Sequence, residues 1–506
     1  MTSVSLFSQR FIKDINPGSV PTTVQHLGNL KNGFVFWAYT DQYGFEPWIS
    51  DGTNSGTQII KDIKTGKSSS WVSDFYYSND TLLYFTAMDN TENEYLFRTD
   101  GTNAGTFKLL KYADHSPATI FNQGIFYKNR FFFIEPRLSG KSTLWSSDGT
   151  IAGTRKIFQF NDSGYSNDIR LKEWKGLLYF MAYDHATGLE LWTSDGTTQG
   201  TKLFKDIFTG TSSGAYHYNQ FLASTKNHLF FCAARNFSEG YELFKTTENP
   251  DSLSLFLDLD TTFGISTNPY LVEANDSIFV YNLEKAYTSG VTKDTVKEFF
   301  SNDPKIHYSN INTIYPFGQG FIVNAQTDFY GNELFSCDRH LNHPVLLKDI
   351  DPGSGPGVQY DIHILGNRIY FIGFNSSLLY DIWTSDGTYD GTNIYLEIPR
   401  GNAPVMMKWQ NHLFFVGNID ESVGDELYEL TLNNSSIAHL NNNKSHLYPN
   451  PIKAGETLQV SVETSQVALY SQTGKLVWTG QAEAGRCTIP EGLSKGIYYI
   501  VIQTKE

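Results

Sequence analysis

Hydrophobic residues recur along the chain in short runs that polar turn segments separate. One stretch carries four of these runs in succession, at 168–174, 177–183, 189–194 and 201–207. In the second run, successive residues are apolar rather than every second one. This is typical of a strand whose sheet is covered on both faces. A turn at 184–188 joins it to the third run as a hairpin. Helical periodicity is convincing nowhere, so the pattern predicts an all-β fold of short strands.

The same four-run unit repeats through the first 440 residues. The segment ELWTSDGTTQGT at 190–201 has relatives in which an aromatic residue precedes Asp-Gly-Thr and then Gly-Thr. Their aromatic positions are Trp48, Phe97, Trp145, Trp192, Phe244, Tyr287, Phe335, Trp383 and Tyr428. These positions are separated by 49, 48, 47, 52, 43, 48, 48 and 45 residues. Four short strands in each period predict a single large β-propeller of about eight or nine four-stranded blades.

The first residues suggest how the propeller closes. Residues 10–15 (RFIKDI) match the fourth run of later units, such as 204–207 (FKDI) and 347–350 (LKDI), yet precede any complete unit. We therefore expect them to supply the last strand of the final blade. The predicted propeller spans 10–440, and residues 1–9 are either the remnant of a signal peptide or a flexible terminus.

The repeated Asp-Gly-Thr segments predict tight turns between the third and fourth strands. Aspartate accepts hydrogen bonds from backbone amides two residues on, and glycine tolerates a positive φ. We expect structural turns led by Asp51, Asp100, Asp148, Asp195 and Asp386. A calcium site is the alternative, although one aspartate per turn falls short of the six to eight oxygens that calcium takes. No other cofactor and no other metal site is expected. The repeated aromatic residue is expected to pack between adjacent blades.

Acidic residues also recur around the turns between the second and third strands. The pairs are Asp41 with Glu46, Asp184 with Glu190, Asp328 with Glu333, and Asp420 with Glu426. They could form a ring of carboxylates that binds cations or basic groups. Ordinary hairpin-turn chemistry is the simpler interpretation.

No catalytic set is recognisable. The G-x-S-x-G pattern at 210–214 lies in a loop that joins two units and precedes no helical pattern, whereas a nucleophile elbow requires one. The histidines are scattered; His340 and His343 near Cys337 replace a repeat turn and are a weak metal candidate. We therefore predict no catalytic residues.

Charge and composition exclude some classes of function. The net charge is −15, which disfavours binding to the phosphate backbone of a nucleic acid. The apolar runs fall well short of the ~18 residues of a membrane span. Three cysteines, far apart, give no disulfide framework.

The repeat resembles the ELWxxDGT repeat family of bacterial exported proteins over most of 10–440. This resemblance implies a propeller in an exported protein and no single activity.

The composition changes after the repeats. Residues 441–446 read as a polar linker, and 447–506 carry alternating strands with glycine turns, which predict a small β-sandwich. Three blocks stand in order: LYPNP at 447–451, a strand with QTGKLV at 472–477, and KGIYYIVI at 495–502. Together they resemble the type A sorting domain of the type IX secretion system of Bacteroidetes. A small structural β-domain is the alternative.

The resemblance implies a route out of the cell. The protein would cross the inner membrane by a signal peptide, and the outer-membrane translocon and its shuttle protein would recognise the tail. The cargo would then be extracellular or attached to the outer cell surface. Recognition is expected to involve Pro449, Asn450, Pro451, Gly474, Lys475, Gly496 and Tyr498.

Three functions remain open at this point. The first is a secreted or cell-surface binding and adhesion protein with a polysaccharide or surface-protein ligand, favoured because a rigid ring presents many loops and no catalytic set. The second is a glycan-processing enzyme with its site in the propeller channel. The third is an accessory component of the secretion or gliding apparatus.

Overall fold

The structure is a computed structural model. It describes residues 9–18, 22–71, 76–111, 124–135, 141–161, 170–215, 222–236, 238, 240–258, 270–274, 276–281, 286–289, 296–298, 308–339, 344–355, 357–374, 380–398, 403–420, 424–430, 457–459, 464–471, 476–483, 486–488 and 498–504.

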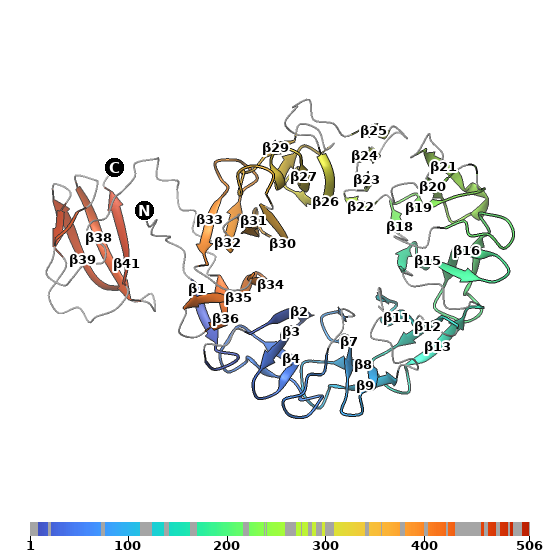
Figure 1. The fold of residues 1–506 in the computed structure, drawn as a ribbon, viewed down its shortest axis with the longest axis horizontal. Coiled ribbons are helices and arrows are strands. Elements are labelled where there is room, and N and C mark those ends of the chain that lie inside the picture. The colour runs from blue at the N-terminus through green and yellow to red at the C-terminus, as the bar shows by residue number, and fades with distance from the viewer. Residues whose placement is uncertain are drawn as a thin grey trace. The chain divides into compact units, whose positions relative to one another are not determined.

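The chain divides into two compact units, residues 9–431, and residues 1–8 together with 432–506. The larger unit is a ring of β-sheets around a central opening (Figure 1). Besides strands, the described residues include one short 3-10 helix, η1 (Pro250–Ser252). No helix in this part of the chain is long and apolar enough to cross a membrane.

The described strands of the ring form nine four-stranded antiparallel sheets, which confirms the prediction of an all-β propeller of eight or nine blades. The first three blades are β2 (Val24–Leu30), β3 (Gly33–Thr40), β4 (Gly44–Ser50), β5 (Gln58–Ile59); β6 (Tyr76–Ser78), β7 (Leu83–Met88), β8 (Glu94–Thr99), β9 (Phe107–Lys111); and β10 (Gly124–Tyr127), β11 (Arg130–Glu135), β12 (Thr143–Ser147), β13 (Arg155–Gln159). The next three are β14 (Lys172–Trp174), β15 (Leu177–Asp184), β16 (Gly188–Ser194), β17 (Lys202–Lys205); β18 (Leu222–Ser224), β19 (Leu229–Ala233), β20 (Glu242–Thr246), β21 (Ser254–Leu257); and β22 (Tyr270–Ala274), β23 (Ser277–Tyr281), β24 (Ala286–Ser289), β25 (Val296–Glu298). The last three are β26 (Tyr308–Phe317), β27 (Gly320–Thr327), β28 (Gly331–Cys337), β29 (Val345–Leu346); β30 (Val358–Leu365), β31 (Arg368–Phe374), β32 (Tyr380–Ser385), β33 (Asn393–Glu397); and β34 (Val405–Trp409), β35 (His412–Asp420), β36 (Gly424–Leu430) with β1 (Gln9–Lys13).

Where Figure 1 labels both strands, as in the blades of β18–β21 and β30–β33, the first strand lies nearest the opening and the fourth lies toward the outer rim. The blade of β14–β17 shows why its sequence folds this way. Its strands overlap the four hydrophobic runs of the repeat, and every residue of β16 is buried. Because neighbouring blades cover both faces of the sheet, successive apolar residues of a middle strand, such as Leu178, Tyr179 and Phe180, are all buried rather than every second one.

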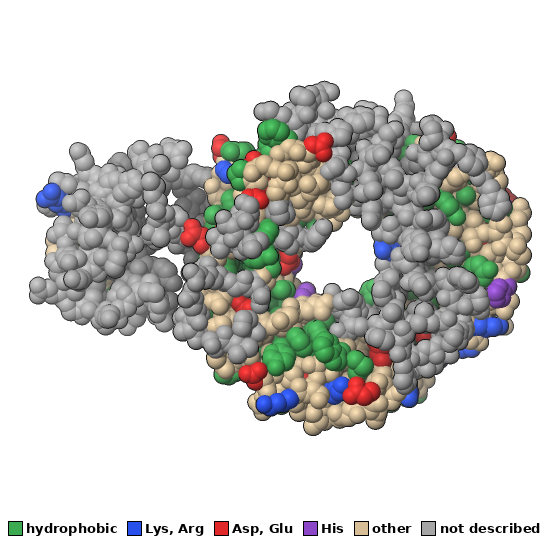
Figure 2. All heavy atoms as spheres, viewed as in Figure 1, with side chains coloured by type: hydrophobic (Ala, Val, Ile, Leu, Met, Phe, Trp, Pro, Cys, Tyr) green, Lys and Arg blue, Asp and Glu red, His purple; other side chains and the backbone are tan. Residues whose placement is uncertain are grey.

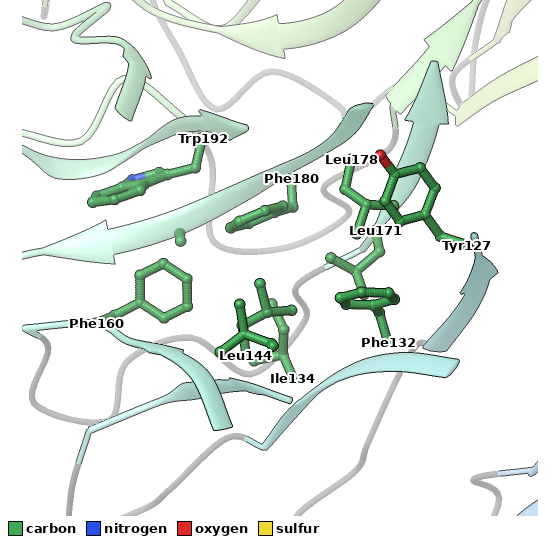
Figure 3. Packing of buried hydrophobic residues seen from close by; sticks show 11 residues of the cluster. Tyr127, Phe132, Ile134, Leu144, Phe160, Leu171, Leu178, Phe180 and Trp192 are labelled. Carbon is green, nitrogen blue, oxygen red and sulfur yellow. The ribbon is translucent and has the colours of Figure 1, made fainter. Parts of the chain in front are cut away.

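The core lies between blades, and the repeated aromatic residue occupies it as the sequence predicts. Between the third and fourth blades, Trp192 and Phe180 face Phe160 (Figure 3), with ring centroids 5.4 and 5.9 Å from that of Phe160. Trp48 and Phe97 pack likewise against the preceding blade. The ring is therefore held by interdigitated side chains at each blade junction.

The two ends of the ring meet in the ninth blade. β1 pairs antiparallel with β36, as the early match of residues 10–15 to a fourth strand predicts. Ile12, 1% exposed, lies in the core with Phe414 and Leu427. Hydrogen bonds thus tie the start of the ring to its last blade.

The described strands of the tail form one five-stranded antiparallel sheet in the order β37-β40-β39-β38-β41. They are β37 (Thr457–Gln459), β38 (Thr464–Ser471), β39 (Leu476–Glu483), β40 (Arg486–Thr488) and β41 (Tyr498–Thr504). The sequence predicts a sandwich of two sheets, whereas the hydrogen bonding is continuous, because the pair Glu483–Arg486 joins β39 to β40.

Candidate functional site

The loops of the ring gather at two ends of the blades. The turn between the second and third strands packs against the loop that joins one blade to the next: a Cβ at Gly44 would lie 2.8 Å from the Lys67 carbonyl oxygen, and one at Gly188 would lie 2.4 Å from that of Ser212. We call this end the hairpin face. The Asp-Gly-Thr turns follow the third strand and therefore lie at the opposite end.

Each clear Asp-Gly-Thr turn is a closed hydrogen-bonded structure. In the first, Asp51 Oδ1 accepts from the Thr53 backbone N–H at 2.9 Å and from its hydroxyl at 2.6 Å. Gly56 N–H donates to Thr53 Oγ1, and the Ser50 and Thr57 hydroxyls bond at 2.7 Å. The same aspartate contacts recur at Asp100, Asp148, Asp195 and Asp386.

These contacts leave little for a metal ion to bind. A Cβ at Gly56 would lie 2.0 Å from Asp51 Oδ1, so the carboxylate is packed against the turn itself. The Thr150 and Thr197 hydroxyls hold the pKa of Asp148 and Asp195 below the ordinary value. Among the described residues, no three His, Cys, Asp or Glu side chains are grouped so as to hold a metal ion. The geometry supports the structural-turn interpretation.

The acidic residues on the third strands are not an exposed ring. Glu46, Glu190, Glu333 and Glu426 are each 0% exposed. Glu46 accepts from the backbone N–H groups of Ile63 and Lys64, both at 3.0 Å. Glu190, Glu333 and Glu426 accept in the same way from Ile207, Ile350 and Ile15. The carboxylates therefore fasten the end of the fourth strand and the start of the joining loop.

Burial shifts these four carboxyl groups strongly. It raises the pKa of Glu46, Glu190 and Glu426 to about 8 and that of Glu333 to about 9. Their turn partners behave differently: Asp184 Oδ1 accepts from Ala186 N–H at 2.8 Å, which is ordinary hairpin-turn chemistry. A cation-binding ring of these glutamates is therefore wrong, because the four side chains are buried and each accepts a hydrogen bond from a backbone N–H inside the blade.

Acidic residues at this place on the third strand are accompanied by a second acidic residue sixteen positions later. Glu46, Glu190, Glu242, Glu333 and Asp381 are followed by Asp62, Asp206, Asp258, Asp349 and Glu397, and ring closure brings Asp14 to Glu426. In the second, third and sixth repeats the sequence positions equivalent to Glu46 hold Tyr95, Thr143 and Lys285, and the positions sixteen residues later hold Lys111, Gln159 and Ser301. One oxygen of Asp62, Asp206 and Asp349 is buried without a hydrogen-bond partner. The acidic pair is thus a unit that is present or absent as a whole.

An aromatic cluster lies on the hairpin face of the first blade. Trp37 on β3 stacks on Phe45 of β4 with ring centroids 4.3 Å apart, and Tyr39 meets Phe45 edge-on at 5.1 Å. Trp71, in the loop to the second blade, lies 6.5 Å from Trp37 and 6.1 Å from Phe45 and is 54% exposed. We call these four residues the Trp71 cluster. On the face that Figure 2 shows, hydrophobic side chains gather over the same two blades.

The Trp71 cluster escapes sequence reasoning because Trp37 and Trp71 do not stand at the repeated aromatic position. One sequence feature could have indicated the cluster: Trp37 and Trp71 fall outside the period that places tryptophans such as Trp48 and Trp192 in the core. Trp48 and Trp192, which follow the period, are each 7% exposed.

A third group lies near the opening. His363 and Asp361 on β30 bond at 2.7 Å, and Asp361 Oδ2 accepts from Met406 N–H at 2.6 Å. His26 on β2 is close enough to interact electrostatically with both, and burial lowers its pKa. Figure 2 shows His and acidic side chains at the edge of the opening. A histidine held by a carboxylate can accept a proton, but Asp361 also ties β34 to β30, which explains the same contacts structurally.

Of the remaining residues that the sequence singles out, some lie in the described part of the chain and others lie outside it. Ser212 of the G-x-S-x-G pattern lies in the loop after β17, where the described residues 206–215 contain no helix. His340, His343 and six of the seven expected recognition residues, Pro449, Asn450, Pro451, Gly474, Lys475 and Gly496, lie outside the described residues. Tyr498 begins β41 and pairs with Ser471 of β38.

Comparison with solved structures shows a likeness to several peptidases at low identity. The chain resembles a prolyl endopeptidase (11% identity, TM-score 0.42), a Mycobacterium tuberculosis puromycin-hydrolyzing peptidase (11%, 0.36) and prolyl oligopeptidase B from Galerina marginata (8%, 0.40). The matches cover 68%, 69% and 78% of this chain. The chain spans little more than half of these proteins, covering 54%, 58% and 55% of their lengths.

Comparison by sequence points to the tail. No curated protein matches the chain. Residues 446–506 match the family described as secretion system C-terminal sorting domain. This tail implies that the protein is a secreted cargo, exported by the type IX system to the cell surface or the extracellular space.

Proposed function

We propose that this protein is a binding and adhesion propeller of the ELWxxDGT repeat family that acts outside a bacterium of the Bacteroidetes. The single observation that carries the proposal is the match of residues 446–506 to a sorting domain. In this proposal the translocon and shuttle protein recognise the tail, with Gly496 and Tyr498 central to recognition. The ligand is a polysaccharide or a surface protein.

The ring supports binding rather than chemistry. Its loops on the hairpin face are fixed by buried carboxylates such as Glu46 and Glu190, so side chains on them are held in place before a ligand arrives. The same face carries an aromatic cluster with Trp71 54% exposed, whereas Glu46, Glu190, Glu333 and Glu426 are buried.

Export is tested by deleting residues 446–506 in the native host. The ring strands fall within residues 9–430, so the truncated chain keeps every described blade pairing. We expect the full chain in the medium or on the surface and the truncated chain in the periplasm. A ring variant, Trp71→Asn, serves as the control and is expected to be exported normally. Export of the truncated chain at the normal level would overturn the proposal.

The two other functions give distinct results in the same preparation. Shortening of a polysaccharide by the purified protein, lost on His363→Ala, would favour an enzyme in the channel. Stable co-purification with the translocon after the tail is removed would favour an accessory component.

A further inference from the structure

We propose that the Trp71 cluster is a carbohydrate-binding platform on which a sugar ring of a neutral polysaccharide stacks. This inference rests on the proposed function and names the ligand class. It starts from the position of Trp71, which lies on a loop yet is fixed relative to the strands beside it.

The strand β4 holds the Trp71 loop by two hydrogen bonds, one from the backbone N–H of Phe45 and one to its carbonyl oxygen. Phe45 N–H donates to Ser69 Oγ at 3.1 Å, and Ser70 N–H donates to the Phe45 carbonyl at 3.0 Å. Ser70 is 0% exposed, and its carbonyl accepts from Met88 N–H at 2.7 Å in the second blade. The residue before Trp71 is therefore pinned to two blades, and the indole is positioned without a ligand.

The backbone of Trp71 itself is unusual. Its φ is +45°, in the left-handed region that a bulky residue rarely adopts. Such a conformation persists where the surroundings impose it, and it is commonly found at binding sites. Here it accompanies a large aromatic side chain turned toward solvent rather than into the core.

The ring geometry leaves aromatic surface for a ligand. Trp37 and Phe45 stack with an interplanar angle of 29°, and together they form a base. Trp71 is tilted by 58° to Trp37 and 40° to Phe45, so it does not close over that base. The faces of aromatic rings carry negative charge density and attract the weakly positive C–H bonds on the flat face of a sugar.

The polar surroundings indicate that the ligand is uncharged. Exposed Gln42 and Ser68 flank the cluster, and Tyr43 accepts from Gln42 at 2.9 Å. The nearby charges Lys64 and Glu92 form an ion pair at 2.9 Å. Hydroxyl and amide groups can bond the hydroxyls of a sugar. The flanking charges, exposed Asp41 and Lys67 and the pair Lys64–Glu92, are of both signs, so they give no excess charge that would select a charged polymer.

Trp71 has no counterpart in the frame of the ring. The loops at the same place in the fourth and seventh blades read SSGA at 212–215 and GPGV at 355–358, without an aromatic residue. The ring therefore closes without an indole at this position, and Trp71 is an addition to one loop.

The test uses the purified full chain and affinity gel electrophoresis with three neutral polymers, a soluble β-glucan, a galactomannan and a xylan, and with acidic alginate. Trp71→Asn removes the ring and suits a left-handed backbone. Trp71→Phe keeps an aromatic face. Phe329→Ala is the matched control. Phe329 is an aromatic residue of similar exposure, 52%, on the turn between β27 and β28 at the hairpin face of the seventh blade. Thermal midpoints establish that each variant is folded.

We expect retardation by at least one neutral polymer, binding about tenfold weaker for Trp71→Asn, partial retention for Trp71→Phe and no change for Phe329→Ala. Absence of neutral-polymer binding, or equal binding by Trp71→Asn, would overturn the platform. Preference for alginate would overturn the neutral glycan in favour of a charged polymer. Self-association that Trp71→Asn abolishes would overturn it in favour of a second copy of this chain. Because export is assayed separately, failure of this site leaves the exported-protein proposal standing, and failure of export leaves the glycan site standing.

Discussion

The backbone N–H of Gly214 donates to Glu190 Oε1 at 2.7 Å, and the same carboxylate fills the space that a side chain at position 214 would need. A glutamate on the third strand of one blade and a glycine in the loop to the next blade are thus one structural unit. The relationship explains why the joining loop follows one path over the hairpin face.

Gly214→Ala is expected to destabilise the ring by about 1–3 kcal/mol, because the added methyl group displaces a buried carboxylate from its donor. The Cβ would lie 2.7 Å from both Glu190 oxygens and 2.9 Å from the Ile207 Cβ. Urea unfolding measures the change. Gly417→Ala is the control, because its Cβ would find its nearest atom at an ordinary 3.4 Å. Equal midpoints for both variants would contradict the steric argument.

The stability of the ring should fall as the pH rises from about 4.5 to about 9. In that window Glu46, Glu190, Glu333 and Glu426 keep their protons in the folded chain and lose them on unfolding, because burial raises their pKa to about 8 or 9. The unfolded chain binds fewer protons there, so the free energy of unfolding decreases with pH and levels off above it. Urea midpoints across this range test the sign.

Glu190→Gln and Glu333→Gln should each flatten that pH dependence, since an amide has no proton to lose. The aspartates of the turns act in the opposite direction at low pH: the pKa of Asp148 and Asp195 is lowered, so their contribution is lost as the pH falls through that lowered value. A midpoint that rises between pH 5 and 9 would refute the assignment of raised pKa values to the buried glutamates.

Asp206→Asn is expected to stabilise the ring more at pH 9 than at pH 5. Asp206 raises the pKa of Glu190 by charge repulsion, and one of its oxygens is buried without a hydrogen-bond partner. Removing one charge relieves that repulsion when both groups are ionised. The pH dependence of the difference in unfolding free energy between variant and parent checks this. A double variant, Glu190→Thr with Asp206→Gln, copies the third blade and should be less destabilised than Glu190→Thr alone.

Asp195→Ala is expected to cost about 1–2 kcal/mol of unfolding free energy, because the Thr197 N–H and hydroxyl lose their shared acceptor. Asp195→Asn keeps an oxygen in place and should cost much less. A chelator should leave the thermal midpoint of the parent unchanged if these turns are structural. A midpoint lowered by chelation and restored by calcium would revive the calcium site.

Ile12→Ala should destabilise the ring by about 2–5 kcal/mol, because it opens a cavity where the first strand closes the ninth blade. Arg10→Ala should cost less than about 1 kcal/mol: Arg10 pairs with Glu429, but its side chain is 54% exposed and water screens the pair. Equilibrium unfolding of both variants compares the two. A larger loss for Arg10 than for Ile12 would mean that the ion pair, and not the apolar core, fastens the ring.

The sequence by itself determines the architecture of this protein. The period that carries Trp48, Trp192 and Trp383 predicts eight or nine blades, because each unit contributes four strands and an aromatic residue at the same place; the structure gives nine four-stranded sheets. The match of residues 10–15 to a fourth strand predicts the closure that β1 and β36 make. Local chemistry also settles the Asp-Gly-Thr turns, since their hydrogen bonds lie within seven residues of one another.

Only the tertiary structure decides where the remaining side chains point. The sequence leaves Glu46 and Glu190 open between an exposed ring and turn chemistry, and the fold buries them against amides from the joining loop. It also brings Trp71 to Trp37 and Phe45, and His26 near His363 across the closure. Periodicity shows which positions recur but not where their side chains point. The glutamate contacts recur in several blades and the Trp71 and His26 contacts are local, yet all of them form only when loops and blades distant in the sequence are packed together.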